Sequence, residues 1–103
     1  MRPPLNASIV GQTRVSTFVC RVDDVFQISG RGCVVTPGIP KSADFELRIG
    51  DVLMLKRPDG SDLRTVLRGI EMGSGPQYPG RPLLLGSDVT KDQVPVGTEV
   101  WTA

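Results

Sequence analysis

The sequence of 103 residues contains no histidine. A His-based catalytic triad is therefore excluded, and so is metal binding through imidazole. The two cysteines, Cys20 and Cys33, cannot form a structural zinc site alone. The adjacent carboxylates Asp23 and Asp24 stand at the end of a predicted strand, where neighbouring side chains point in opposite directions. Because no nucleophile–base pair can be recognised, the sequence predicts a protein that is not an enzyme and uses neither cofactor nor metal.

Long apolar runs are also absent. No stretch approaches about 18 consecutive apolar residues, the length that spans a bilayer. The residues that follow Met1–Leu5 are polar and small, and they lack the apolar centre of a signal peptide. We therefore expect a cytoplasmic protein with no membrane partner.

A disulfide is not expected. If the segments that carry Cys20 and Cys33 pair as a hairpin about Gly30, the two residues lie about seven rungs apart, or roughly 23 Å. A disulfide needs Cα atoms within about 7 Å of each other. Buried free thiols are therefore predicted at both positions.

The two charge signs are nearly balanced: the sequence has 12 Lys and Arg residues and 11 Asp and Glu residues, which gives a formal net charge of +1. Nothing in the overall charge attracts the chain to nucleic acid. Any RNA binding must therefore depend on a local site.

Helical periodicity is missing as well, since no window keeps a 3.6-residue apolar repeat between its glycines and prolines. These two residue types, 12 Gly and 9 Pro, instead punctuate short apolar runs. The runs predict strands at 16–22, 25–28, 33–36, 52–57, 63–72, 83–85 and 98–101. Segments 39–45 and 73–82 are predicted as loops, 58–61 as a tight turn, and Gly69 as a bulge. This pattern favours one closed barrel or sandwich over residues 16–103, preceded by an N-terminal arm at 1–15.

One segment carries a family resemblance. Asp24–Thr36, with the sequence DVFQISGRGCVVT, resembles the opening of domain 2 of elongation factor Tu and related translational GTPases. Three further segments are similar to this family in the same order: Ile49–Val52, Thr65–Met72 and Val94–Val100. The resemblance implies an all-β fold, a single small closed antiparallel β-barrel. It covers the second domain only, and no Gly-x-x-x-x-Gly-Lys-(Ser/Thr) loop is present, so GTP binding is not expected.

The resemblance also implies a site. In the family, this barrel presents a pocket for the aminoacyl end of transfer RNA, and RNA or a ribosomal or other translation component is the partner that follows. The matching positions in this sequence are Asp23, Asp24, Phe26, Arg31, Thr36, Glu71 and Met72. Carboxylates accept hydrogen bonds from an α-ammonium or ribose hydroxyls, arginine binds phosphate, and an aromatic or methionine face stacks on a base.

The same residues have structural alternatives. Phe26 alternates with Ile28 in a strand, which predicts a core position for its ring, and Arg31 can pair with a nearby carboxylate. Asp23 and Asp24 can form an ordinary turn, and Glu71 can be solvated. The sequence departs from the family at 37–41 and 73–80, both on predicted loops that would border the pocket. The alternative function is therefore a protein-interaction or immunity-type module with a single protein partner, which uses the barrel as a scaffold.

Overall fold

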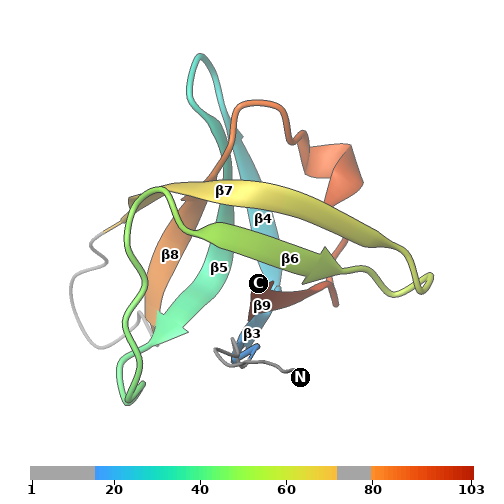
Figure 1. Ribbon diagram of the computed structural model, residues 1–103. Helices are drawn as coiled ribbons and strands as arrows, with labels where there is room; N and C mark the ends of the chain where they lie inside the picture. The colour runs from blue at the N-terminus through green and yellow to red at the C-terminus, as the bar shows by residue number, and fades with distance from the viewer. Residues whose placement is uncertain (1–15, 72–79) are drawn as a thin grey trace, which may run out of the picture.

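The computed structural model describes residues 16–71 and 80–103 (Figure 1). The predicted N-terminal arm at 1–15 lies outside the described residues. Within these two ranges seven strands follow one another: β3 (Phe18–Arg21), β4 (Asp24–Ile28), β5 (Gly32–Pro40), β6 (Val52–Lys56), β7 (Asp62–Ile70), β8 (Gly80–Leu85) and β9 (Glu99–Thr102). A single 3₁₀ turn, η1 (Lys91–Gln93), precedes β9. The described residues contain no α-helix, so the prediction of an all-β fold is confirmed. Among the same residues there is therefore no helix long and apolar enough to cross a bilayer.

The strands form one antiparallel sheet in the order β3-β9-β6-β7-β8-β5-β4. The sheet curls so strongly that β6 and β7 cross in front of β4, β5 and β8 (Figure 1). The closed barrel is not confirmed, because the edge strands β3 and β4 form no ladder with each other although they are consecutive in the chain. The two residues between them bond elsewhere: Val22 N donates to Thr98 O at 2.8 Å and Asp23 N to Thr36 O at 2.8 Å.

The core fills the inner face of the curled sheet. In β6, Leu53 and Leu55 are fully buried while the residues between and beside them face outward, as the two-residue period of a strand requires. Val25 and Val35 are directly opposite each other in the β4–β5 hairpin and are both buried. Full burial of each such aliphatic side chain stabilises the fold by about 1.5–3 kcal/mol.

Strand β5 is longer than the sequence predicts. The prediction of a loop from 39 to 45 is wrong at its start, because β5 continues to Pro40 and Ile39 is fully buried. Pro37 does not end the strand, since the register with β8 shifts between Val35 and Ile39, and at such a bulge the missing backbone donor is not needed. The peptide bond before Pro37 is cis.

The end of the predicted 73–82 loop is also strand. Gly80–Pro82 belong to β8, because Ile39 and Pro40 of the extended β5 pair with Arg81 and Gly80. The predicted bulge at Gly69 is confirmed by a register shift between Leu67 and Gly69. The tight turn after β6 is confirmed as well: Arg57 N donates to Ser61 O at 2.8 Å.

Both cysteines are buried free thiols, as predicted. Burial raises the pKa of Cys20 to about 11; the nearby charge of Asp23 adds to this rise, and a backbone hydrogen bond at Gly38 opposes it. Burial also raises the pKa of Cys33, whose Sγ lies 3.2 Å from Gln27 Oε1 and 3.3 Å from Val89 O. The two thiols therefore act as small apolar core groups at neutral pH.

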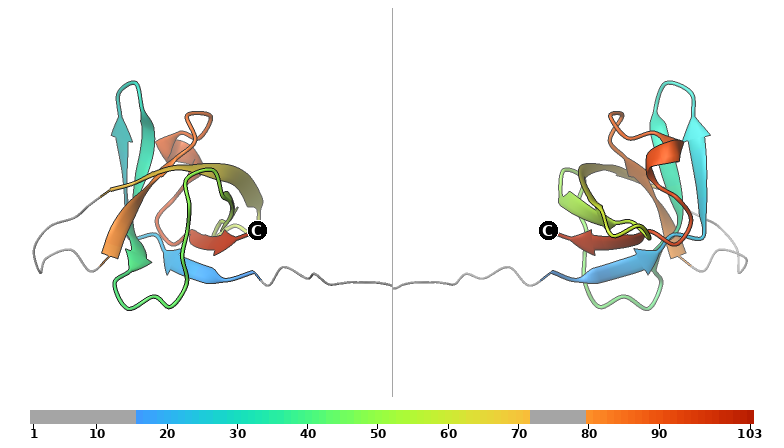
Figure 2. Two further views of the ribbon diagram at one scale, coloured as in Figure 1. Left: turned by 60° about the vertical axis from the view of Figure 1, so that its left-hand side comes forward. Right: turned by 90° about the vertical axis from the view of Figure 1, so that its right-hand side faces the viewer.

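The β4–β5 hairpin rises beyond the rest of the sheet, with η1 beside it (Figure 2). One side chain links them: Gln27 Oε1 accepts a hydrogen bond from Lys91 N at 3.0 Å. This contact holds η1 against β4.

Candidate functional site

The outer face of β4, β5, β8 and β7 carries a row of side chains set by the strand register. Residues directly opposite each other in a sheet share a face. Since Val25 and its partner point into the core, Phe26 and its partner Val34 point outward. Val34 is opposite Leu84, and Leu84 is opposite Gly69. The row therefore runs Phe26, Val34, Leu84 and Gly69 across four strands, and we call it the Phe26 face.

Phe26 is 50% exposed, so the prediction of a core position for its ring is wrong. The alternation that the sequence predicts is real, but Val25 occupies the inward position, which reverses the assignment. Val34 and Leu84 are only 6% and 7% exposed although they face outward. The half-exposed ring therefore stands at one side of a buried apolar floor.

An ion pair stands at the other side of this floor. Arg31 Nη2 lies 3.2 Å from Glu71 Oε2, and the two side chains are 52% and 35% exposed. Glu71 Oε2 is 4.0 Å from the place where a Cβ on Gly69 would be, so the carboxylate lies above the residue that has no side chain. The expected pairing of Arg31 with a nearby carboxylate is confirmed. An exposed pair of this kind contributes at most about 1 kcal/mol, so a ligand can replace it at little cost.

The other predicted residues lie at the opposite end of the hairpin. Asp24 is directly opposite Thr36, and Thr36 Oγ1 donates to Asp23 Oδ1 at 2.5 Å. Asp24 Oδ1 accepts a hydrogen bond from Val25 N at 2.8 Å. Both aspartates are exposed. Asp24 begins β4, and Asp23 just before it donates its backbone N–H to Thr36 O, so neither aspartate forms the turn given as the structural alternative.

The structure thus brings six of the predicted residues onto or beside one face. The acidic pair and Thr36 are at the start of β4, and Phe26 is in its middle. Arg31, at the tip of the hairpin, pairs with Glu71, whose carboxylate lies by Gly69 on the other side of the floor. Met72 lies outside the described residues. The sequence analysis missed the floor residues Val34 and Leu84, because an apolar run does not reveal which of its members face outward.

The groups on this face are of kinds that can bind a flat polar molecule. An aromatic ring beside an apolar floor stacks on a base, a guanidinium binds phosphate, and carboxylates accept hydrogen bonds from sugar hydroxyls or amines. No group of three or more Cys, Asp or Glu residues that could hold a metal ion occurs within residues 16–71 and 80–103.

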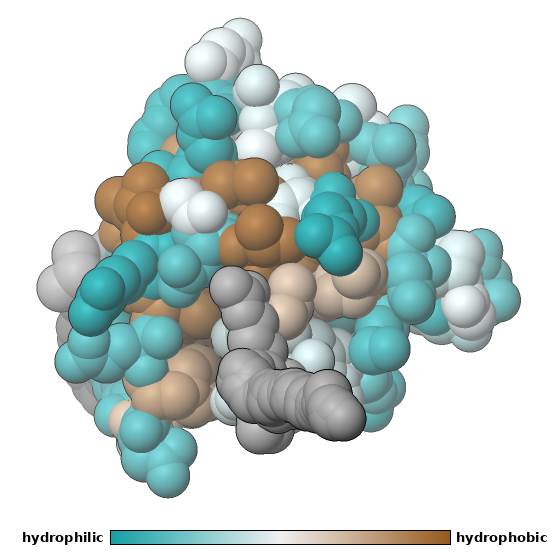
Figure 3. Space-filling view, in the orientation of Figure 1, coloured by the Kyte–Doolittle hydropathy of each residue, from teal (hydrophilic) through white to brown (hydrophobic). Residues whose placement is uncertain are grey.

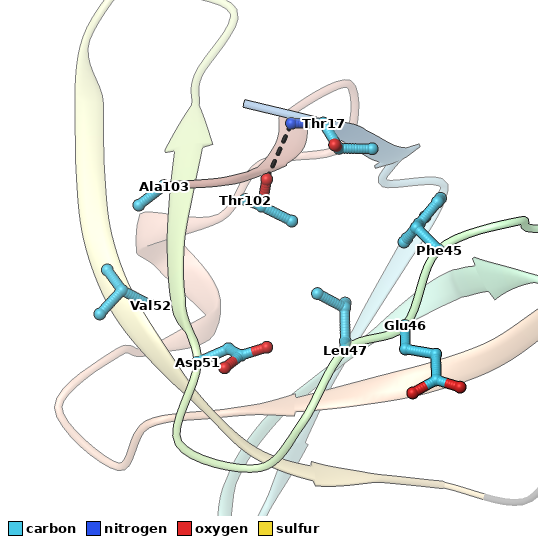
Figure 4. A pocket seen from close by; sticks show the side chains of 8 residues that line it. All are labelled: Thr17, Phe45, Glu46, Leu47, Asp51, Val52, Thr102 and Ala103. Carbon is cyan, nitrogen blue, oxygen red and sulfur yellow. Dashed lines mark hydrogen bonds between the residues drawn. The ribbon is translucent and has the colours of Figure 1, made fainter. Parts of the chain in front are cut away.

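Two hollows lie elsewhere on the molecule. One has a volume of about 370 Å³ and lies where β6 begins and β9 ends (Figure 4); its lining is Thr17, Phe45, Glu46, Leu47, Asp51, Val52, Thr102 and Ala103. In it Thr17 N donates to Thr102 Oγ1 at 2.8 Å, and Asp51 Oδ2 accepts from Arg48 N at 2.9 Å. The other hollow, of about 510 Å³, is lined by Arg21, Lys56, Arg57, Pro58, Val96, Gly97 and Glu99. Neither is lined by any of the seven predicted site residues.

Comparisons with protein-family models, with curated proteins and with solved structures found no match.

Proposed function

We propose that this chain is a non-catalytic binding module that docks on RNA by taking a terminal nucleotide on the Phe26 face. The observation that carries the proposal is the half-exposed Phe26 ring across a buried apolar floor from the Arg31–Glu71 pair. A ring that is 50% exposed contributes little to the core, whereas it offers one side to a base.

The positions of the polar groups support the same proposal. With a base stacked on Phe26, Arg31 at the far end of the hairpin is placed for phosphate, and Glu71 for ribose hydroxyls. Asp24, two residues from Phe26 on the same face, is available for a cationic group attached to the nucleotide. These roles agree with those implied by the resemblance to domain 2 of elongation factor Tu.

The barrel that this resemblance implies belongs to the proposal too. The edge strands β3 and β4 are consecutive, and β3 also lies against β5, which is the arrangement expected of a sheet near closure. A translation-linked role in the cytoplasm follows if the nucleotide belongs to transfer RNA or to a ribosomal component.

The test is the affinity for a short fluorescent RNA that ends in an unmodified adenosine, measured by anisotropy. Phe26→Ala removes the stacking surface, worth about 1–3 kcal/mol per base, so we expect affinity to fall about 5- to 150-fold. Glu71→Gln should weaken binding of this RNA more than of one whose terminal ribose hydroxyls are blocked. Ile49→Ala is the matched control, since Ile49 is also an exposed apolar residue, 68% exposed, and lies on no part of this face.

Equal binding by wild type, Phe26→Ala and Glu71→Gln would refute the proposal. Nuclease-insensitive recovery of one protein from a lysate, lost in Phe26→Ala and unaffected in Ile49→Ala, would refute it in favour of the interaction-module alternative.

A further inference from the structure

A second outer face, on the other half of the sheet, combines aromatic and cationic side chains. Strand register places Phe18, Trp101, Met54 and Arg64 opposite one another in a row across β3, β9, β6 and β7. The next row along the strands is Arg21, Glu99, Lys56 and Asp62. In Figure 3, apolar patches lie among hydrophilic groups over β6 and β7, the part of this face that is turned to the viewer.

A bulge in β3 makes this combination possible. The register of β3 against β9 shifts between Phe18 and Cys20, so Val19 and Cys20 are both buried. As a result Phe18 and Arg21 both face outward, although residues three apart in a regular strand face opposite ways. The irregularity sets an aromatic ring and a guanidinium on one surface, roughly 10 Å apart along the strand.

The aromatic part has a fixed geometry. The rings of Phe18 and Trp101 meet edge to face, with centroids 5.4 Å apart and planes at 70°. Trp101 Nε1 donates to Glu99 Oε1 at 3.0 Å, which fixes the indole. Phe18 is 42% exposed, so its ring remains available to a partner.

The cationic part lines the 510 Å³ hollow at the end of β6. Arg57 is oriented by Nε–H donation to Ser61 Oγ at 2.8 Å and by Nη1–H donation to Gln93 O at 3.3 Å. Arg21 pairs with Glu99 at 2.9 Å but keeps 64% of its side chain exposed, and Lys56 is exposed. The lining has three cations and one acid, Glu99, while Asp62 lies opposite Lys56 just outside it.

We propose that this face binds a single-stranded nucleic acid segment, with phosphates in the hollow of Arg21, Lys56 and Arg57 and a base against Phe18 and Trp101. Stacking platforms beside a cationic groove are the recognition chemistry of single strands. An acidic peptide would use the cations but not the aromatic rings, so nucleic acid fits more of the surface. The face shares no residue with the Phe26 face and does not depend on the function proposed for it.

Trp101 is the only tryptophan in the chain, so its fluorescence reports directly on this face. Titration with a short oligouridylate should quench it saturably. With three phosphates bound, the affinity should fall with salt with a log–log slope of about −2, since each phosphate on a single strand contributes about −0.7. Lys56→Ala should reduce the slope by about 0.7. Lys91→Ala is the matched control and should leave the slope unchanged, because Lys91 is exposed, does not line the hollow and lies at the end of η1 that bonds to Gln27 of β4.

Phe18→Ala should weaken the oligouridylate about 5- to 150-fold, and Phe26→Ala should not weaken it, which separates this site from the first one. The proposal is overturned if oligouridylate fails to quench Trp101, or if Lys56→Ala and Lys91→Ala behave alike. It is also overturned in favour of an acidic protein partner if polyglutamate binds with the same salt slope and Lys56 dependence while oligouridylate does not.

Discussion

The close approach of the paired strands β5 and β8 can be tested at Gly38. This residue lies in the bulge through which β5 continues past Pro37. In Gly38→Ala, the new Cβ would lie 1.8 Å from the carbonyl oxygen of Arg81 and 2.5 Å from its carbonyl carbon. Both are backbone atoms, so no side-chain rotation relieves the overlap. Strand β8 must move, and with it the neighbouring residue Leu83, which is fully buried.

The magnitude has two parts. Gly38 has φ +80°, in the left-handed region, and this conformation costs an L-residue roughly 1–2 kcal/mol. Overpacking against fixed backbone adds about 1–3 kcal/mol. The variant should therefore lose roughly 2–5 kcal/mol of unfolding free energy, a large part of the about 5–15 kcal/mol that small domains possess.

The assay is equilibrium denaturation by urea, and the control is Gly30→Ala. Gly30 has nearly the same backbone angle, φ +77°, but nothing lies within 4 Å of its Cβ position. Gly30→Ala should show only the conformational part, about 1–2 kcal/mol, and the difference between the two variants isolates the overlap. Equal stability of the two variants, with unchanged denaturant slopes, would contradict this reasoning. It would mean that the backbones of β5 and β8 do not approach closely at Gly38 and that the extension of β5 to Pro40 is wrong.

Two further predictions concern an exposed ring and a buried thiol. Leu53→Ala should lower the free energy of unfolding by about 2–5 kcal/mol, and Phe26→Ala should lower it by less, since Leu53 is fully buried and Phe26 is 50% exposed. Equal losses for the two variants in thermal unfolding would mean that the Phe26 ring is part of the core. The folded-state pKa of Cys20 is about 11 against 9.0 for an ordinary thiol, so both states keep the proton below pH 9, and between pH 9 and 11 only the unfolded state releases it. Stability should therefore fall by up to about 2–3 kcal/mol over that interval and less steeply in Cys20→Ala; parallel pH profiles by urea denaturation would show that the thiol is not buried.

The sequence predicts the strands of this protein well because Gly and Pro mark most of their ends. It also singles out, through the family resemblance, six residues that lie on or beside the Phe26 face: five in or next to the β4–β5 hairpin, and Glu71 just after β7. Its errors have a common physical origin. Strand β5 continues past Pro37 because a bulge against β8 accommodates the proline. Whether Phe26 or Val25 faces inward depends on which face of the β4–β5 hairpin packs against the core. Both are set by contacts between distant segments, which local pattern does not contain.

The distribution of aromatic residues connects the two proposed sites. The fully buried core of the described residues is aliphatic, built from Val, Leu and Ile with two cysteines, and the aromatic ring that packs against it, Phe45, is only partly buried. Phe18 and Phe26 are instead about half exposed, each on a different half of the sheet, although either would add more buried area to the core than a valine does. Exposed rings of this kind are the groups on which bases stack. If Phe18→Ala and Phe26→Ala each lose little unfolding free energy and each weaken binding of a different nucleic acid segment, then these two rings serve recognition rather than folding.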